Sequence, residues 1–284
     1  MPSPAARRTQ LGERAIDING LRSRYIDVRP EHETALPLLL IHGHASRIEE
    51  YETLVPHLSN GRRVIVADLP GCGFADKPTD EPYTLQRYED FLLGLLDQLK
   101  IERATLAGGS LGGNLTLRLG ARDTERFARL AAWAPAGAWV PMRRWQWLAR
   151  TMRLSPSLFW PAIWIQSRFW YSPSWEGRQD ALDQAFRYYR EVWGPGFHRM
   201  YWDVGHDQAR TSLFDHVDKI VQPTWLGWGD QDHALDMGVG VRMLAELISG
   251  SELVIFQGAR HSLANERTEE LGRAVHGFLE SAPR

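Results

Sequence analysis

A serine flanked by glycines is the strongest chemical signal in the chain. It lies in Gly-Gly-Ser-Leu-Gly at residues 108–112, after an apolar run, and Leu111, Leu115 and Leu119 then follow at the spacing of a helix face. A sharp strand-to-helix turn exposes a serine hydroxyl, and flanking glycines let neighbouring elements approach it. The start of the helix also directs free N–H groups at a developing oxyanion. The pattern predicts that Ser110 is a nucleophile.

Two other interpretations of this motif stay open. The glycines could belong to an ordinary strand–helix turn with an incidental serine, or to a loop that cradles phosphate. A dinucleotide-binding loop, however, needs Gly-x-Gly-x-x-Gly and an acidic residue about 20 positions later. The glycines here bracket a serine instead, which favours the nucleophile.

Two further motifs precede the serine, each after an apolar run typical of a buried strand. They are His-Gly-His at residues 42–44 and Asp-x-Pro-Gly-x-Gly at residues 68–73. In this order, and together with Gly-x-Ser-x-Gly, they resemble the α/β-hydrolase family. The resemblance covers about residues 13–279, except for the middle of the chain. It implies a mostly parallel eight-stranded sheet with an antiparallel second strand, flanked by helices.

The resemblance also implies an acid and a base, in the chain order serine, acid, histidine. Asp230 and Asp232 follow an apolar run, and the family's Gly-x-x-Asp pattern selects Asp232, with Asp230 as the alternative. Among ten histidines, His261 lies on the loop after the last expected strand, where the family carries its base. Taken singly, these aspartates and this histidine could be solvated loop residues. Three motif positions in the family's order support the assignment.

The family's oxyanion hole consists of two backbone N–H groups, which here belong to His44 and Leu111. The His44 side chain could face the pocket or be an ordinary loop histidine, and we expect His42 to fix the loop. The pair His42-x-His44 is a weak metal signal, because the spacing suggests no further ligands. We therefore expect neither a metal nor a cofactor.

Strands and helices alternate at both ends of the chain. Asn19-Gly20 predicts a tight turn between strands at 15–19 and 21–28. Continuous apolar runs predict strands buried in a parallel sheet at Pro37–Ile41, Val64–Ala67, Ala104–Ala107, Leu130–Trp133, Thr224–Leu226 and Leu253–Phe256. Helical spacing is present over Thr84–Leu99, with Thr84 as the N-cap, and over Val241–Ile248 and Glu269–Leu279. This alternation predicts the α/β class.

The alternating pattern stops in the middle of the chain. Residues 137–210 contain nine of the 12 tryptophans, ten arginines, six acidic residues and no lysine. Helical fragments are expected at Trp145–Met152 and Gln179–Val192. We therefore expect a helical cap at 137–210 inserted into a core made of 1–136 and 211–284. Its aromatic side chains could line an apolar substrate pocket, or could only attach the cap to the core.

Composition limits the classes of partner. A net charge of -2 and a pI near 6.6 give no sign of nucleic acid or an anionic membrane. The N-terminus lacks the apolar stretch of a secretory signal, and no apolar run approaches the roughly 18 residues of a membrane span. Cys72 is the only cysteine, so no intrachain disulfide can form. We expect a cytoplasmic monomer or homodimer whose partner is a small-molecule substrate.

These residues predict a serine hydrolase that cleaves a carboxylic ester of a small, apolar or aromatic molecule through an acyl-enzyme. Hydrolysis of a lactone, an amide or the carbon–carbon bond of a ring-cleavage product could use the same triad. The carbon–carbon subfamily usually has Asn before the serine and Trp after the histidine, where this chain has Gly109 and Ser262. Dehalogenases and epoxide hydrolases of this fold need an aspartate nucleophile. A ligand-binding receptor with slow turnover is the alternative from another class.

Overall fold

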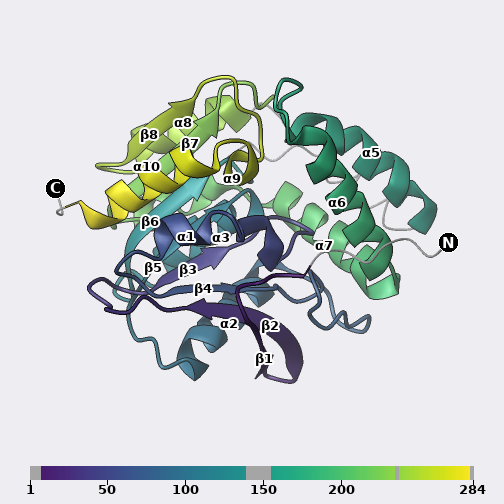
Figure 1. The fold of residues 1–284 in the computed structure, drawn as a ribbon, viewed down its shortest axis with the longest axis horizontal. Helices are drawn as coiled ribbons and strands as arrows, with labels where there is room; N and C mark the ends of the chain where they lie inside the picture. The colour runs from purple at the N-terminus through teal and green to yellow at the C-terminus, as the bar shows by residue number, and fades with distance from the viewer. Residues whose placement is uncertain (1–7, 139–154, 234–236, 282–284) are drawn as a thin grey trace.

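A central eight-stranded sheet organises the protein (Figure 1). The computed structural model describes residues 8–138, 155–233 and 237–281. The strands are β1 (Glu13–Ile18), β2 (Leu21–Val28), β3 (Leu38–Ile41), β4 (Val64–Ala67), β5 (Ala104–Gly109), β6 (Phe127–Trp133), β7 (Thr224–Gly229) and β8 (Glu252–Phe256). Their order across the sheet is β1-β2-β4-β3-β5-β6-β7-β8. Only β2 runs antiparallel to its neighbours β1 and β4, so the predicted sheet is confirmed.

Helices cover both faces of the sheet. They are α1 (Val55–Leu58), α2 (Leu85–Gln98), α3 (Leu111–Arg122), α5 (Phe159–Trp170), α6 (Arg178–Val192), α7 (Pro195–Arg210), α8 (Met237–Leu247), α9 (Leu263–Glu266) and α10 (Thr268–Glu280), with short 3₁₀ turns η1 (Ile48–Tyr51), η2 (Pro156–Leu158), η3 (Leu213–Asp215) and η4 (Val217–Lys219). Side chains of α1, α9 and α10 join one apolar core, and those of α2, α3 and α8 join the core on the opposite face. This two-sided burial explains the continuous apolar runs of the central strands.

Local signals placed most of these elements correctly. Asn19 and Gly20 have positive φ angles of 53° and 84°, as the predicted hairpin turn requires. The Thr84 hydroxyl accepts a hydrogen bond from the Arg87 N–H at the start of α2, so the N-cap is confirmed. The run Leu253–Phe256 differs from its prediction, because β8 is an edge strand and its first four residues are only partly buried.

Among the described residues between β6 and β7, the helices α5, α6 and α7 gather on one side of the sheet (Figure 1). The helix predicted at Gln179–Val192 corresponds to α6. The one predicted at Trp145–Met152 lies outside the described residues. The division of the chain at residues 137 and 210 stays a prediction. Within the described ranges, no helix has the length and apolar character needed to span a bilayer.

Parallel pairing brings the carboxyl ends of six strands, β3 to β8, to one edge of the sheet. In register, Ile41 of β3 pairs with Gly108 of β5, and Gly109 pairs with Trp133 of β6. The register continues to Gly229 of β7, which pairs with the last residue of β8. The segments that directly follow these strands, including the first residue of α3, carry every sequence-predicted site residue, so the sheet order gathers them at one place.

Candidate active site

Ser110 lies on the turn between β5 and α3. Its φ of 56° and ψ of -117° are a conformation that non-glycine residues rarely adopt. The backbone around it enforces this geometry: the Ser110 N–H donates to the Trp133 carbonyl over 3.0 Å, and its own carbonyl accepts from the Ala136 N–H over 2.9 Å. The strained turn is therefore anchored to the end of β6.

Two glycines next to the serine are required by close packing. A Cβ on Gly112 would overlap the Ile41 carbonyl, so only glycine lets α3 begin against the end of β3. A Cβ on Gly109 would overlap the indole nitrogen of Trp133. The Gly109 N–H also donates to the Tyr51 hydroxyl over 3.0 Å. Glycine at both positions is a consequence of the neighbouring elements.

A chain of hydrogen bonds joins Ser110, His261 and Asp232. The Ser110 hydroxyl oxygen lies 3.0 Å from Nε2 of His261, and Nδ1 of His261 lies 2.7 Å from Oδ2 of Asp232. The Asp232 side chain is fully buried, with 0% of its surface exposed. The alternative acid, Asp230, accepts instead from the Gly258 N–H over 2.6 Å. Of the two aspartates on this loop, only Asp232 reaches the imidazole.

The surroundings of His261 favour its protonated form. Burial opposes the charge, but Asp232 attracts it and accepts a hydrogen bond from the ring, and the carboxylates of Glu50 and Glu266 add to this attraction. The net result is a pKa for His261 above its ordinary value of 6.5. A histidine so placed can accept a proton from Ser110 and share the resulting charge with Asp232.

His42 holds the loop after β3. Its Nε2 accepts from the Leu69 N–H over 3.0 Å, so Nδ1 carries the proton and donates to the Gly43 carbonyl over 2.8 Å. Backbone groups occupy both ring nitrogens, as expected for a residue that fixes the loop. Leu111 is the first residue of α3, where an N–H has no partner within the helix.

The side chain of His44 lies at the pocket. Its ring stacks on Tyr201, with centroids 4.8 Å apart, and its Nε2 is buried without a hydrogen-bond partner among the described residues. Burial lowers the pKa of His44 to about 4, so the imidazole is uncharged at neutral pH.

A family model described as alpha/beta hydrolase fold matches residues 37–267. The chain belongs to the α/β-hydrolase family. This match covers most of the sequence and spans all the motifs that surround Ser110 and His261. The family assignment makes the protein a hydrolase in the broad sense.

Curated relatives of this α/β-hydrolase carry different substrates in their names. A 2-hydroxymuconate semialdehyde hydrolase from Pseudomonas sp. (strain CF600) is 27% identical over 87% of this chain and 87% of its own length. Monoacylglycerol lipase abhd6-A from Xenopus laevis is 23% identical over 86% of this chain and 75% of its own. Among solved structures, the enol-lactonase from Burkholderia xenovorans LB400 superposes with a TM-score of 0.81 at 24% identity, over 94% of this chain and 100% of that one.

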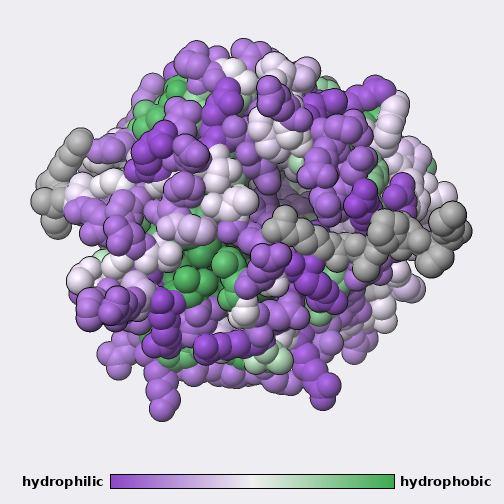
Figure 2. All heavy atoms as spheres, viewed as in Figure 1, coloured by the Kyte–Doolittle hydropathy of each residue, from purple (hydrophilic) through white to green (hydrophobic). Residues whose placement is uncertain are grey.

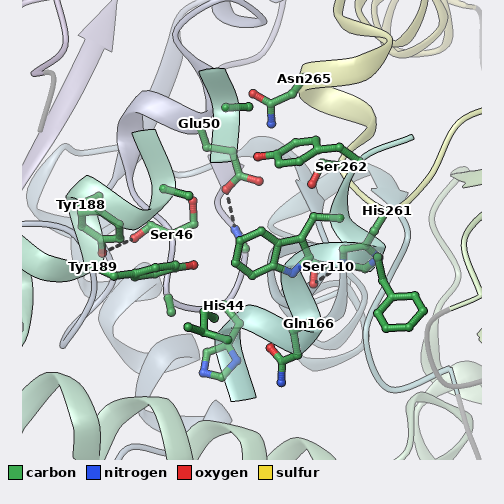
Figure 3. A pocket seen from close by; sticks show the side chains of 18 of the residues that line it. His44, Ser46, Glu50, Ser110, Gln166, Tyr188, Tyr189, His261, Ser262 and Asn265 are labelled. Atoms are coloured by element: carbon green, nitrogen blue, oxygen red, sulfur yellow. Dashed lines mark hydrogen bonds between the residues drawn. The ribbon is translucent and has the colours of Figure 1, made fainter. Parts of the chain in front are cut away.

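A cavity of about 1000 Å³ opens beside Ser110 in this α/β-hydrolase. In Figure 2 the surface is hollowed between the part that carries α9 and the part that carries α6, and both elements contribute to the cavity wall. In Figure 3 Ser110 and His261 lie at one side of this space, opposite Tyr188 and Tyr189. The triad residues thus meet a cavity large enough for a small organic substrate.

Aromatic side chains form much of the cavity wall. The aromatic lining residues are Phe169, Trp170, Tyr171, Trp175, Tyr188, Tyr189, Tyr201 and Trp202. Other rings pack behind them: Phe159 is buried and contacts Trp160 and Trp193, neither of which lines the cavity. Aromatic side chains of this segment therefore both line the cavity and pack against one another behind its wall.

Sequence reasoning missed two carboxylates near His261. Glu50, in η1, lines the cavity and accepts a hydrogen bond from the Gly43 N–H over 3.1 Å. Glu266, in α9, accepts from the N–H groups of Ser172 and Arg260, and burial raises its pKa. Neither glutamate belongs to a motif, so no sequence signal distinguished them from other acidic residues.

Proposed function

We propose that this protein hydrolyses a carboxylic ester through an acyl-enzyme on Ser110. The observation that carries the proposal is the hydrogen-bonded chain Ser110–His261–Asp232 at the wall of an aromatic cavity. A serine alcohol is a weak nucleophile at neutral pH, and a histidine in contact with it removes its proton as it attacks.

The reaction follows from these contacts. The Ser110 oxygen attacks the acyl carbon while its proton passes to Nε2 of His261, and the N–H groups of Leu111 and His44 stabilise the oxyanion. The tetrahedral intermediate collapses, the bond from the acyl carbon to the alcohol oxygen breaks, and His261 gives the proton to the leaving alcohol. Water then attacks the acyl-enzyme, losing its proton to His261, and Ser110 leaves with that proton as the acid is released.

Two local features favour an ester over a ring-cleavage product. Asparagine cannot replace Gly109 without displacing Trp133, and the residue after His261 is Ser262, so neither position has the residue usual in carbon–carbon hydrolases. The relative from Pseudomonas sp. (strain CF600) is named for a muconate, which bears a carboxylate. The only Lys or Arg among the described lining residues is Arg47, which already lies 3.5 Å from Glu49.

Replacing the nucleophile tests the proposal directly. Ser110→Ala should abolish turnover of p-nitrophenyl esters, because no other group can form the acyl-enzyme, and should leave the circular dichroism spectrum and melting temperature close to wild type. Residual activity near the wild-type level would refute the role of Ser110.

A substrate panel and a covalent probe separate the rival functions. We expect p-nitrophenyl esters to be hydrolysed with a higher kcat/KM than a 2-hydroxy-6-oxo-dienoate, a lactone or an anilide. A fluorophosphonate should label Ser110 rapidly in an enzyme. Failure of labelling, together with no turnover across the panel, would favour a ligand-binding receptor instead.

A further inference from the structure

Two adjacent glutamates in η1 have different electrostatic surroundings. The Glu49 carboxylate lies 2.7 Å from the guanidinium of Arg24 and 3.5 Å from that of Arg47. Glu50 has no Lys or Arg within ion-pair distance among the residues that the structure describes; its hydrogen-bond donor is the Gly43 N–H. A carboxylate at a cavity wall with no cation beside it makes the potential of that cavity negative.

The rest of the cavity does not offset this charge. Arg47, the only lysine or arginine of the described lining, is shared between Glu49 and the face of Tyr188. The low pKa of His44, about 4, keeps that imidazole neutral. Glu52 and, on α6, Asp180 are further acidic side chains at the wall. An anionic substrate would meet repulsion here, and a cationic one would meet attraction.

Aromatic rings surround the same space. Burial raises the pKa of the Tyr171 and Tyr189 hydroxyls, and the charge of Glu50 adds to the effect on each. Trp170 packs 6.2 Å from Tyr189, centroid to centroid. Figure 3 shows the Glu50 carboxyl group pointing into the pocket between Tyr189 and Ser262. Ring faces attract positively charged nitrogen, most strongly where water is excluded.

We propose that Glu50 and the surrounding aromatic side chains form a subsite for a positively charged nitrogen, so that the preferred substrate is an ester that carries an ammonium group. The inference rests on the proposed ester hydrolysis and specifies its substrate class. Glu50 acts in binding, at a distance from the bond that breaks.

A structural role for Glu50 makes a different prediction. Its hydrogen bond with the Gly43 N–H could serve only to hold the loop after β3. Glutamine retains an acceptor oxygen of the same reach but has no charge, so Glu50→Gln preserves this contact and removes only the electrostatic attraction. Glu176→Gln is the matched control, because Glu176 is exposed and does not line the cavity.

The test compares esters of equal shape that differ in charge. One pair is a choline ester and its isostere in which carbon replaces the nitrogen. The other is a pair of p-nitrophenyl esters whose acyl chains end in trimethylammonium or in tert-butyl. Values of kcat/KM are measured at low salt and at a pH where the rate no longer changes with pH, so that His261 titration does not affect the comparison. Each value is divided by the rate of hydroxide-catalysed hydrolysis of the same ester, which removes differences in intrinsic reactivity.

In at least one pair, we expect the wild type to prefer the cationic ester and Glu50→Gln to reduce that preference by about tenfold. Glu176→Gln should keep the preference within about twofold, because the high dielectric constant of water weakens the field of an exposed charge outside the cavity. The cation subsite is refuted if Glu50→Gln keeps the wild-type preference within about twofold in both pairs, or if the wild type prefers the neutral ester in both pairs. In either case ester hydrolysis stands.

Inhibition of the wild type provides a test that requires no variant. Tetramethylammonium should compete with a neutral ester at least about tenfold more strongly than tert-butyl alcohol does. Equal inhibition by the two would refute the subsite even if Glu50→Gln failed to fold. If no ester were hydrolysed, the proposed function would fail, and quenching of tryptophan fluorescence by tetramethylammonium, compared in wild type and Glu50→Gln, would still decide the subsite.

Discussion

At the scale of single residues, the chemistry depends on how one imidazole is surrounded. His261 contacts Ser110 through one ring nitrogen and Asp232 through the other, which orients it for proton transfer. Glu50 and Glu266 add negative potential without touching the reacting serine, and this raises the pKa of His261 further. Three carboxylates from three separate segments of the chain therefore outweigh the effect of burial on the pKa of this base.

The acid limb of the pH profile should reflect these carboxylates. His261 must be unprotonated to accept the Ser110 proton, so kcat/KM falls as the pH drops through its pKa. Because that pKa is raised, the half-maximal point should lie above pH 6.5, and Glu50→Gln should move it to lower pH by removing one attractive charge. Measuring kcat/KM from pH 5 to 9 for both proteins checks this. A half-maximal point at or below pH 6.5 in the wild type, or the same half-maximal point in the wild type and the variant, would contradict this prediction.

The two neighbouring aspartates should respond differently to the same change. Asp232→Asn removes the charge that orients and stabilises the imidazolium, and we expect kcat to fall by roughly three to four orders of magnitude. Asp230→Asn should keep most of the activity, since Asp230 only accepts a hydrogen bond from Gly258. Steady-state kinetics on one p-nitrophenyl ester compares the two. A larger loss in Asp230→Asn would reverse the assignment of the acid.

At the scale of elements, local sequence and neighbouring structure both set where a helix or strand begins. Thr84 starts α2 through its own side chain, as an isolated helix would require. The start of α3 is different, because Ser110 makes no side-chain cap and the turn is held by Trp133 at the end of β6 and by Ala136 in the segment after it. The helix that supports the nucleophile thus depends on tertiary contacts for its first turn.

Removing the α2 cap should affect stability alone. Thr84→Ala leaves the Arg87 N–H without its acceptor, and we expect the free energy of unfolding to fall by about 1 kcal/mol, with kcat/KM unchanged below the melting transition. Thr84→Ser keeps the hydroxyl and should restore most of the loss. Urea denaturation of the three proteins measures this. Equal stability of the alanine and serine variants would show that the hydroxyl is not the cause.

At the scale of the whole molecule, a buried ion cluster ties the N-terminal hairpin to the site. Arg24 of β2 lies 2.6 Å from Asp68, which follows β4, and 2.7 Å from Glu49 of η1. Asp68 also accepts from the N–H groups of Ile48 and Phe74. The cluster holds η1, and therefore Glu50, in place relative to the sheet.

Breaking this cluster should be costly. Arg24→Met leaves the fully buried Asp68 without its cationic partner and leaves Glu49 with only the more distant Arg47, and we expect the free energy of unfolding to fall by about 3–5 kcal/mol. Arg14→Met is the control: that arginine is 57% exposed and lies 3.5 Å from Asp27, so its loss should cost less than about 1 kcal/mol. Thermal and urea unfolding compare the two. Similar effects would mean that the cluster contributes little.

The sequence by itself determined the element types, the sheet class and the family. Burial on one or two faces leaves a periodic pattern within a few residues, and the turn around Ser110 needs glycines at adjacent positions. The tertiary structure decided which aspartate meets His261, how the cavity is lined, and that Glu50 faces it while Glu49 is neutralised by arginine. The physical reason is distance along the chain: residues 50, 110 and 261 meet because parallel pairing aligns the carboxyl ends of the strands that precede them, and spacing in the sequence does not encode that arrangement.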